Sequence, residues 1–235
     1  MTTEAPRPRF PGESEEYRAA RERLLEAEVA LRRQVEAVAQ LRRGLPPGGE
    51  VSTDYIFEEW DEQTQAPRQV RMSALFGRHE TLFLYSHMFN PGETGTPLEA
   101  PCPLCTSIID GIDGAVPHIS QRIAFAVAAK APIERLRGHG QRRGWRSARL
   151  LSSAHSTYNR DYLAETSDAD QCAMATVFTR RDGAIRHAWS SELWFVPPEP
   201  GQNPRHVDFM WPLWSVLDRG PEGRGQDWWP ELEYP

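Results

Sequence analysis

The chain has 235 residues, a formal net charge of −6 at pH 7 and three cysteines. This length fits one large domain with an extension, and 39% hydrophobic residues suffice for a packed core, which excludes a disordered protein. Lys and Arg form no long run of like charge. We therefore expect no nucleic-acid partner, because binding to a phosphate backbone depends on clustered cations.

Neither a secretion signal nor a membrane-spanning segment is expected. Residues 1–13 are polar and proline-rich, without the apolar core of a signal peptide. The longest purely apolar run, residues 123–129, is far shorter than the roughly 20 residues that span a bilayer. We expect a cytoplasmic protein with no membrane partner, in which a structural disulfide is disfavoured.

Residues 14–43 predict a long helix. They are rich in Glu, Arg, Ala and Leu and contain no Gly or Pro, while Ser14 can cap the start and Gly44 the end. An apolar stripe at helical spacing is formed by Tyr17, Leu24, Leu31, Val35 and Val38. The stripe can pack on its own domain or on a second copy, so a homodimer through this helix stays open.

Ahead of the cysteine pair, the sequence predicts mainly extended structure. In order, we expect an extended segment at 51–60, a turn region at 61–68, a strand or short helix at 70–76, a strand at 81–89 and a loop at 90–101. The run at 81–89 is apolar and rich in aromatic residues, which is typical of a buried central strand.

After the cysteine pair, helices and strands are predicted to alternate. In order, we expect a helix at 106–119 that is split or kinked by Gly111, Gly114 and Pro117, a strand at 123–129, a helix from Pro132, a strand at 148–152, a hairpin of 173–179 and 184–189 around Asp182-Gly183, and a helix near 208–217. This order predicts a thioredoxin-like α/β sandwich, a central mixed sheet flanked by helices. Residues 50–235 would form this domain, and residues 1–49 the tail and helix.

The segment Cys102-Pro103-Leu104-Cys105 is the strongest candidate site. With Cys102 as N-cap, Pro103 occupies the first helical position, where proline is favoured. The unsatisfied N–H groups of a helix N-terminus stabilise a thiolate, so we expect a Cys102 pKa below the ordinary value of about 8.5. Cys102 would attack a substrate disulfide, and Cys105 would resolve the mixed disulfide.

Other roles for the cysteines compete with this one. Two buried cysteines can simply pack, and Cys172 is expected to act as a small hydrophobic residue, with a third redox role as the alternative. A structural zinc site needs four ligands, but Cys172 is the only other cysteine and no His-x₃₋₅-His spacing occurs, so no metal is expected. The peroxidase pattern Pro-x-x-x-Thr-x-x-Cys is not met, although a low-pKa Cys102 can react with peroxide.

No cofactor is expected. The glycine-containing loop at residues 138–144 has one residue too many for the dinucleotide pattern Gly-x-Gly-x-x-Gly. It also follows a predicted helix, whereas a dinucleotide loop follows a strand.

Several segments together resemble the DUF899 family, which is described as thioredoxin-like predicted dithiol-disulfide oxidoreductases. They are residues 72–77, 82–89, 102–105, 111–113, 211–214 and 221–225. The resemblance covers most of the chain and implies Cys102 and Cys105 as the site. One feature departs from the general thioredoxin pattern: no proline precedes the strand expected from Met174, where a cis-proline normally contacts the substrate disulfide.

The sequence therefore predicts a thiol–disulfide oxidoreductase that acts on a protein or small-molecule thiol or disulfide. Two alternatives stay open. One is a non-catalytic binding protein that uses the Trp-rich C-terminal region and the long helix as contact surfaces. The other is a peroxiredoxin-like peroxidase.

Overall fold

The structure is a computed structural model that describes residues 8–89, 101–166, 170–197, 199–200, 210–220 and 228–234. The chain divides into two compact units, Met1–Pro46 and Pro47–Pro235. The loop expected at 90–101 lies, apart from Pro101, outside the described residues, as does the expected helix start near residue 208.

The first unit contains helix α1 (Glu15–Arg43), as predicted. The Ser14 hydroxyl accepts a hydrogen bond from the Tyr17 N–H at 3.1 Å, which satisfies one of the free amides at the helix start. Acidic residues occupy the first turn and basic residues the last, and these charges stabilise the helix by interacting favourably with its dipole. Pairing of two copies through α1 stays a prediction.

The second unit is built on a mixed sheet. Within the described residues it has seven strands in the order β2-β1-β5-β4-β3-β6-β7. The strands are β1 (Ile56–Asp61), β2 (Ala66–Arg71), β3 (Thr81–His87), β4 (Ala124–Ala129), β5 (Arg149–Ser152), β6 (Met174–Arg181) and β7 (Ala184–Ser190). Strand β3 is parallel to β4, and β4 to β5, whereas β6 is antiparallel to β3 and β7 to β6.

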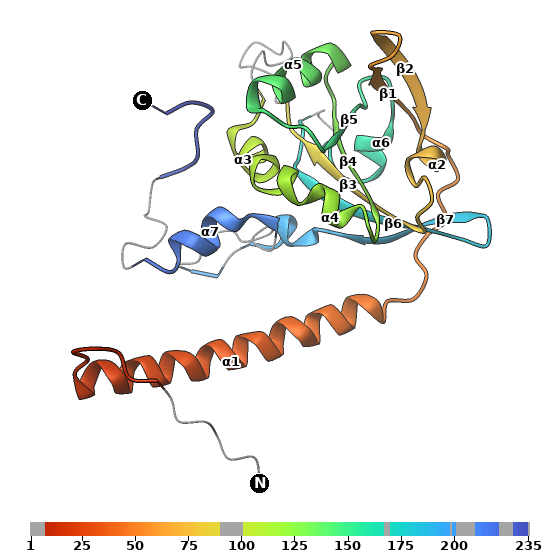
Figure 1. Cartoon of the computed structure of the whole chain (residues 1–235). Helices are drawn as coiled ribbons and strands as arrows, with labels where there is room; N and C mark the ends of the chain where they lie inside the picture. Colours follow the sequence, from red (N-terminus) through yellow and green to blue (C-terminus); the bar gives the residue numbers. More distant parts are fainter. Residues whose placement is uncertain are drawn as a thin grey trace. The chain divides into compact units, whose positions relative to one another are not determined.

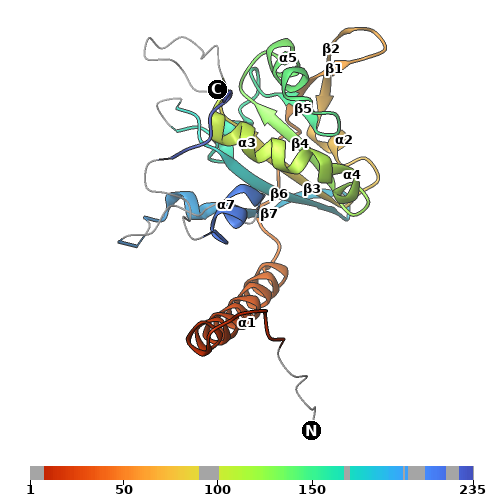
Figure 2. The same cartoon turned by 60° about the vertical axis from the view of Figure 1, so that its left-hand side comes forward.

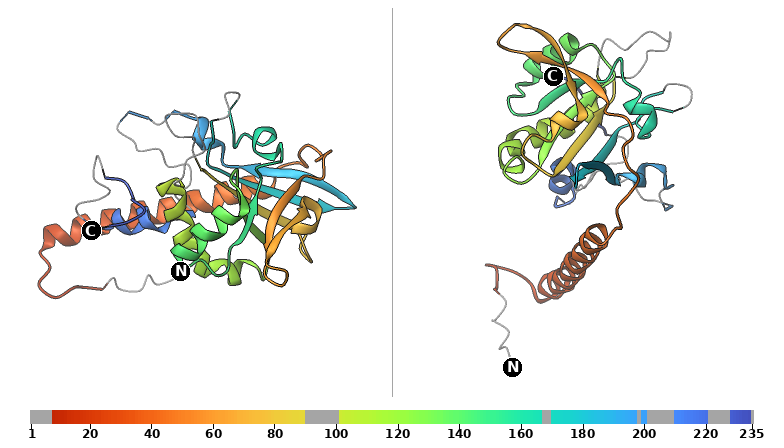
Figure 3. Two further views of the ribbon diagram at one scale, coloured as in Figure 1. Left: turned by 90° about the horizontal axis from the view of Figure 1, so that it is seen from above. Right: turned by 90° about the vertical axis from the view of Figure 1, so that its right-hand side faces the viewer.

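Helices cover both faces of this sheet (Figure 1). They are α2 (Met72–Leu75), α3 (Pro103–Ile112), α4 (Val116–Ile119), α5 (Ile133–Arg143), α6 (Tyr158–Asp161) and α7 (Pro212–Leu217), with 3₁₀ turns η1 (Asp113–Ala115) and η2 (Glu192–Phe195). The unit β3-α3-β4, followed by the β6-β7 hairpin beside β3 and by α7, is the predicted thioredoxin-like α/β fold. The sheet twists between the β1-β2 and β6-β7 hairpins (Figure 3).

The edge strand β2 is a correction to the sequence prediction. Its residues were expected to lie partly in a turn at 61–68, but they pair in register with β1, from Asp61 opposite Ala66 to Ile56 opposite Arg71. Pro67 obscured this strand, because proline cannot donate a hydrogen bond to a neighbouring strand. The pairing is nevertheless possible because β2 lies at the edge of the sheet.

Two other local predictions are confirmed. Asp182 and Gly183 join β6 to β7 with φ angles of 52° and 79°, the left-handed pair that a tight hairpin turn requires. The helix expected at 106–119 is split, as α3, η1 and α4 follow one another.

The side chains of β3 separate the two halves of the core. Leu82 and Leu84 face the cluster that also contains Tyr158 of α6, whereas Tyr85 faces the cluster of α3 and α7. Strand β4 is buried along its whole length because both of its faces are covered (Figure 2). The cysteine-bearing helix thus lies on the Tyr85 face of the sheet.

Helix α7 is held against α3 by close contacts. A Cβ atom at Gly111 would lie 2.9 Å from Pro212 Cγ, so a larger residue there would push the helices apart. Trp211 Nε1 donates a hydrogen bond to Ser107 Oγ at 2.7 Å. Trp211 and Trp214 are buried, so these two tryptophans serve packing.

No helix in the described part of the chain is long and apolar enough to cross a membrane.

Candidate functional site

The two cysteines lie at the start of α3, next to the end of β3. Cys102 is the N-cap with an extended backbone, and Pro103 is the first helical residue, as predicted. The Cys102 N–H donates to the Met88 carbonyl at 2.9 Å, which ties the helix start to the end of the central strand. Cys105 follows one turn into the helix, so both thiols lie at the helix N-terminus.

Both cysteines are free thiols and both are buried. Cys102 is 6% exposed and Cys105 is 1% exposed. This gradient suits a pair in which the first thiol meets a substrate and the second stays inside.

The surroundings separate the acidities of the two thiols. The hydrogen bond from the Cys105 thiol is the largest influence that lowers the Cys102 pKa, which falls to about 7 although burial opposes it; the N–H groups of Cys105 and Leu104 add to the effect. Burial, and then the adjacent Cys102, raise the pKa of Cys105. Near neutral pH, a larger fraction of Cys102 is therefore ionised to the thiolate, whereas Cys105 remains protonated.

Tyr85 brings a phenol to the same place. It is fully buried in the core cluster that contains Cys102 and Cys105. Its hydroxyl has no hydrogen-bond partner of normal geometry among the described residues. Burial raises the Tyr85 pKa, and the neighbouring Cys105 raises it further. The Cys105 sulfur is the acceptor next to this hydroxyl, but a thiol accepts only weakly, so the hydroxyl is poorly satisfied in the reduced protein.

Beyond Cys105, Thr106 joins two buried histidines. Its hydroxyl lies 3.3 Å from His87 Nε2 and 3.1 Å from His139 Nε2. One hydroxyl can donate to one ring and accept from the other. Burial, followed by the effect of His139, lowers the His87 pKa to about 3. Burial, followed by Arg142 and Arg143, lowers the His139 pKa to about 4.

Sequence reasoning missed both Tyr85 and the His87–Thr106–His139 chain. The available signal was the alternation along β3, which places Tyr85 and His87 on the face opposite to Leu84. The position of Thr106, directly after Cys105, was a second signal. His139 could not be added, because no sequence spacing links α5 to α3.

The buried histidines predict a loss of stability in mild acid. A histidine with a lowered folded pKa gives stability that is present above the unfolded pKa of about 6.5 and is lost as pH falls toward the folded value. For His87 the folded value is about 3. The loss at pH 5 is about 2 kcal/mol, from 1.36 kcal/mol per pKa unit.

We expect His87→Gln to remove its own share of about 2 kcal/mol, roughly half of the loss that His87 and His139 together give between pH 7 and pH 5. Urea unfolding at several pH values measures this loss, and His155→Gln, at an exposed histidine, serves as the control. Equal slopes for the wild type and His87→Gln would contradict the buried, neutral state of His87.

The position at which a thioredoxin fold has its cis-proline, directly before Met174, lies at the start of β6. Ala173 precedes Met174 and belongs to the cysteine core cluster. No cis peptide bond occurs among the described residues. Cys172 is partly exposed, and its N–H donates to the Ala164 carbonyl at 2.9 Å.

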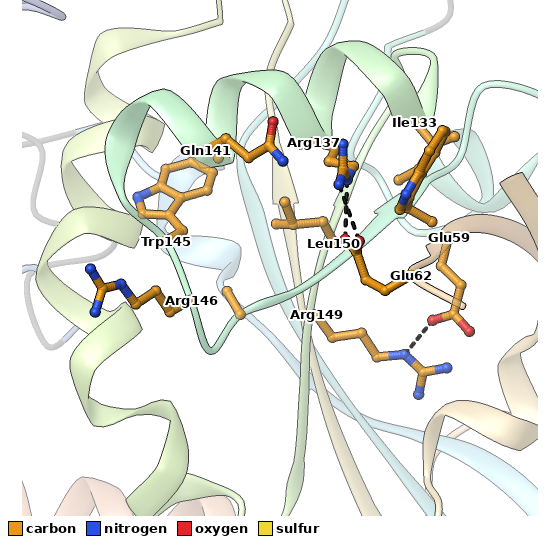
Figure 4. Close-up of a pocket in the computed structure, with 12 residues that line it drawn as sticks. Glu59, Glu62, Ile133, Arg137, Gln141, Trp145, Arg146, Arg149 and Leu150 are labelled. Carbon is orange, nitrogen blue, oxygen red and sulfur yellow. Dashed lines mark hydrogen bonds and ion pairs between the residues drawn. The ribbon is translucent and has the colours of Figure 1, made fainter. Parts of the chain in front are cut away.

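A pocket of about 270 Å³ lies between α5, β5 and β1 (Figure 4). Two of its arginines are neutralised: Arg137 makes a two-point contact of 3.1 Å with Glu62, and Arg149 Nε lies 2.7 Å from Glu59. The pocket wall is thus an ion-paired surface.

In the described part of the chain, no group of three or more His, Cys, Asp and Glu side chains is arranged to hold a metal ion.

A family model described as "Bacterial protein of unknown function (DUF899)" matches residues 8–234. A search of curated proteins finds no match to this sequence.

Solved structures with a similar fold include three peroxiredoxins. Reduced 2-Cys peroxiredoxin from Plasmodium vivax is 13% identical, with a TM-score of 0.43 and coverage of 74% of this chain and 96% of that chain. Reduced Prx3 from Vibrio vulnificus, in complex with H₂O₂, is 8% identical, with a TM-score of 0.43 and coverage of 68% and 91%. Peroxidoxin BcpB from Mycobacterium tuberculosis is 16% identical, with a TM-score of 0.40 and coverage of 71% and 94%.

Proposed function

The chain belongs to the DUF899 family of bacterial proteins of unknown function, and from its own site we propose that it is a thiol–disulfide oxidoreductase using Cys102 and Cys105. One observation carries this proposal. Cys102, whose thiol has a pKa of about 7, is the N-cap residue of α3, and the more deeply buried Cys105 thiol, whose pKa is raised, donates a hydrogen bond to it from one turn further along the helix. This is the arrangement that thiol–disulfide exchange requires.

The reaction balances in two steps. The Cys102 thiolate attacks one sulfur of a substrate disulfide, forming a mixed disulfide and releasing one substrate thiolate, which takes up a proton. Cys105 then loses its proton and attacks Cys102 Sγ, so the second substrate thiolate leaves. The substrate disulfide is reduced to two thiols, and Cys102 and Cys105 are oxidised to one disulfide.

The partner is a protein or small-molecule disulfide or dithiol. Because Cys102 is 6% exposed and Cys105 is 1% exposed, the substrate meets Cys102 first. The proposal places the reaction in the cytoplasm, where a thiol pool can return the pair to the reduced state.

Reaction with glutathione disulfide tests the proposed function. A Cys172→Ser background removes the third thiol, and mass spectrometry follows the reduced protein after addition of the disulfide. We expect one internal Cys102–Cys105 disulfide and two equivalents of glutathione. If the protein stays reduced or carries glutathione permanently on both cysteines, it is no dithiol oxidoreductase.

The lowered Cys102 pKa is also what a peroxidase needs. Consumption of hydrogen peroxide is therefore measured on the same Cys172→Ser protein. Rapid peroxide consumption with slow reaction toward glutathione disulfide would favour the peroxidase alternative. If Cys102→Ser/Cys105→Ser leaves the cellular role of the protein intact, the non-catalytic alternative is favoured instead.

A further inference from the structure

We propose that the Tyr85 hydroxyl donates a hydrogen bond to the Cys105 thiolate as it forms to attack the mixed disulfide on Cys102. This inference rests on the proposed function and assigns the group that assists its second step. It starts from a buried hydroxyl, that of Tyr85, which has no hydrogen-bond partner of normal geometry among the described residues.

The second step needs such a group. Cys105 is 1% exposed, so no bulk water reaches its sulfur when the proton leaves. A thiolate formed in a low-dielectric core is stabilised only by donors that already point toward it. The Cys102 sulfur cannot serve, because it is bonded to the substrate at that moment.

The hydroxyl that interacts with Cys105 is that of Tyr85, and not that of Thr106, the next residue in the chain. The Thr106 hydroxyl is occupied by His87 and His139, at 3.3 Å and 3.1 Å. Tyr85 lies in the same core cluster as Cys105, on the face of β3 that α3 covers. The backbone of Met88 is the other group that favours the ionised form of Cys105.

The phenol is suited to donate and not to act as a base. Burial and the adjacent Cys105 keep the Tyr85 pKa above its ordinary value of about 10, so the hydroxyl remains protonated at every pH at which the protein works. In the reduced protein the Cys105 thiol is a weak acceptor, and the hydroxyl stays poorly satisfied. When Cys105 ionises, the same hydroxyl gains a charge-assisted hydrogen bond.

Tyr158 offers a matched control. It is also a fully buried tyrosine with an unpartnered hydroxyl among the described residues. It lies in the other core cluster, away from the cysteines. Tyr158→Phe therefore makes the same chemical change without removing a group beside Cys105.

The test separates the two steps of exchange in the Cys172→Ser background. Glutathione disulfide is added at low pH to load Cys102, the pH is raised, and quenched samples report the rate at which glutathione is released. We expect Tyr85→Phe to slow this release roughly 10-fold and to raise the pH midpoint of the step, with an unchanged rate of loading. Tyr158→Phe should match the wild type.

The groups that face Cys105 across this pH range are Cys102, Tyr85 and the Met88 backbone, and beyond Thr106 the histidines with pKa values of about 3 and 4. Damaged packing would slow release equally at every pH, whereas loss of a donor raises the midpoint. If the Tyr85→Phe variant releases glutathione with the same pH midpoint as the wild type, the inference is overturned. A wild type that never loads or never releases glutathione overturns the proposed function instead.

Discussion

In the Cys105→Ser variant, a substrate disulfide is expected to leave half of itself covalently attached to Cys102. The attacking thiol is intact, but no second thiol can displace the mixed disulfide. In Cys102→Ser, exchange should fall by roughly 1,000-fold or more, because a serine hydroxyl does not ionise and the buried Cys105 thiol is 1% exposed. Non-reducing mass spectrometry after incubation with glutathione disulfide measures both outcomes.

Cys172→Ser is the control for these variants, since it removes a cysteine that is assigned no step. It should exchange at the wild-type rate. A trapped adduct on Cys105 in Cys102→Ser, at the rate seen for Cys102 in Cys105→Ser, would reverse the assigned roles.

The second large effect concerns the acidity of Cys102. Alkylation by iodoacetamide should follow a titration with a midpoint near pH 7, the pKa of about 7 that the Cys105 thiol sets by its hydrogen bond. Cys105→Ala removes that donor, and the midpoint should rise by about one unit or more toward the ordinary value of about 8.5. The midpoint is the proper readout, because the reactivity of a thiolate itself rises with its pKa.

Cys105→Ser is the matched variant here, because its hydroxyl can still donate to Cys102. Its midpoint should stay closer to that of the wild type than the midpoint of Cys105→Ala. Identical alkylation midpoints for the wild type, Cys105→Ser and Cys105→Ala would contradict the role of Cys105 and show that the helix N-terminus alone lowers the Cys102 pKa.

Much of the fold follows from local pattern. The apolar run of β3, the Pro103 after Cys102 and the Asp182-Gly183 turn each act within a few residues, so the sequence alone was sufficient to place them. The strand β2 was missed for a physical reason. Pro67 forbids a central position, but the sequence does not reveal that its strand lies at an edge.

The site divides in the same way. Cys102 and Cys105 could be predicted from the sequence because two residues three positions apart lie about one turn apart on a helix. Tyr85 and His139 could not be assigned, because their proximity to α3 arises from tertiary packing of β3 and α5. The burial of His87, which lowers its pKa to about 3, is likewise a property of the assembled core.

The central claim is that Cys102 and Cys105 form one redox couple. Thiol trapping across a dithiothreitol redox titration of the Cys172→Ser protein tests it most directly. We expect both cysteines to become protected from alkylation together, along a single two-electron curve. Oxidation of the two residues at separate potentials, or alkylation of both at every potential, would contradict the account.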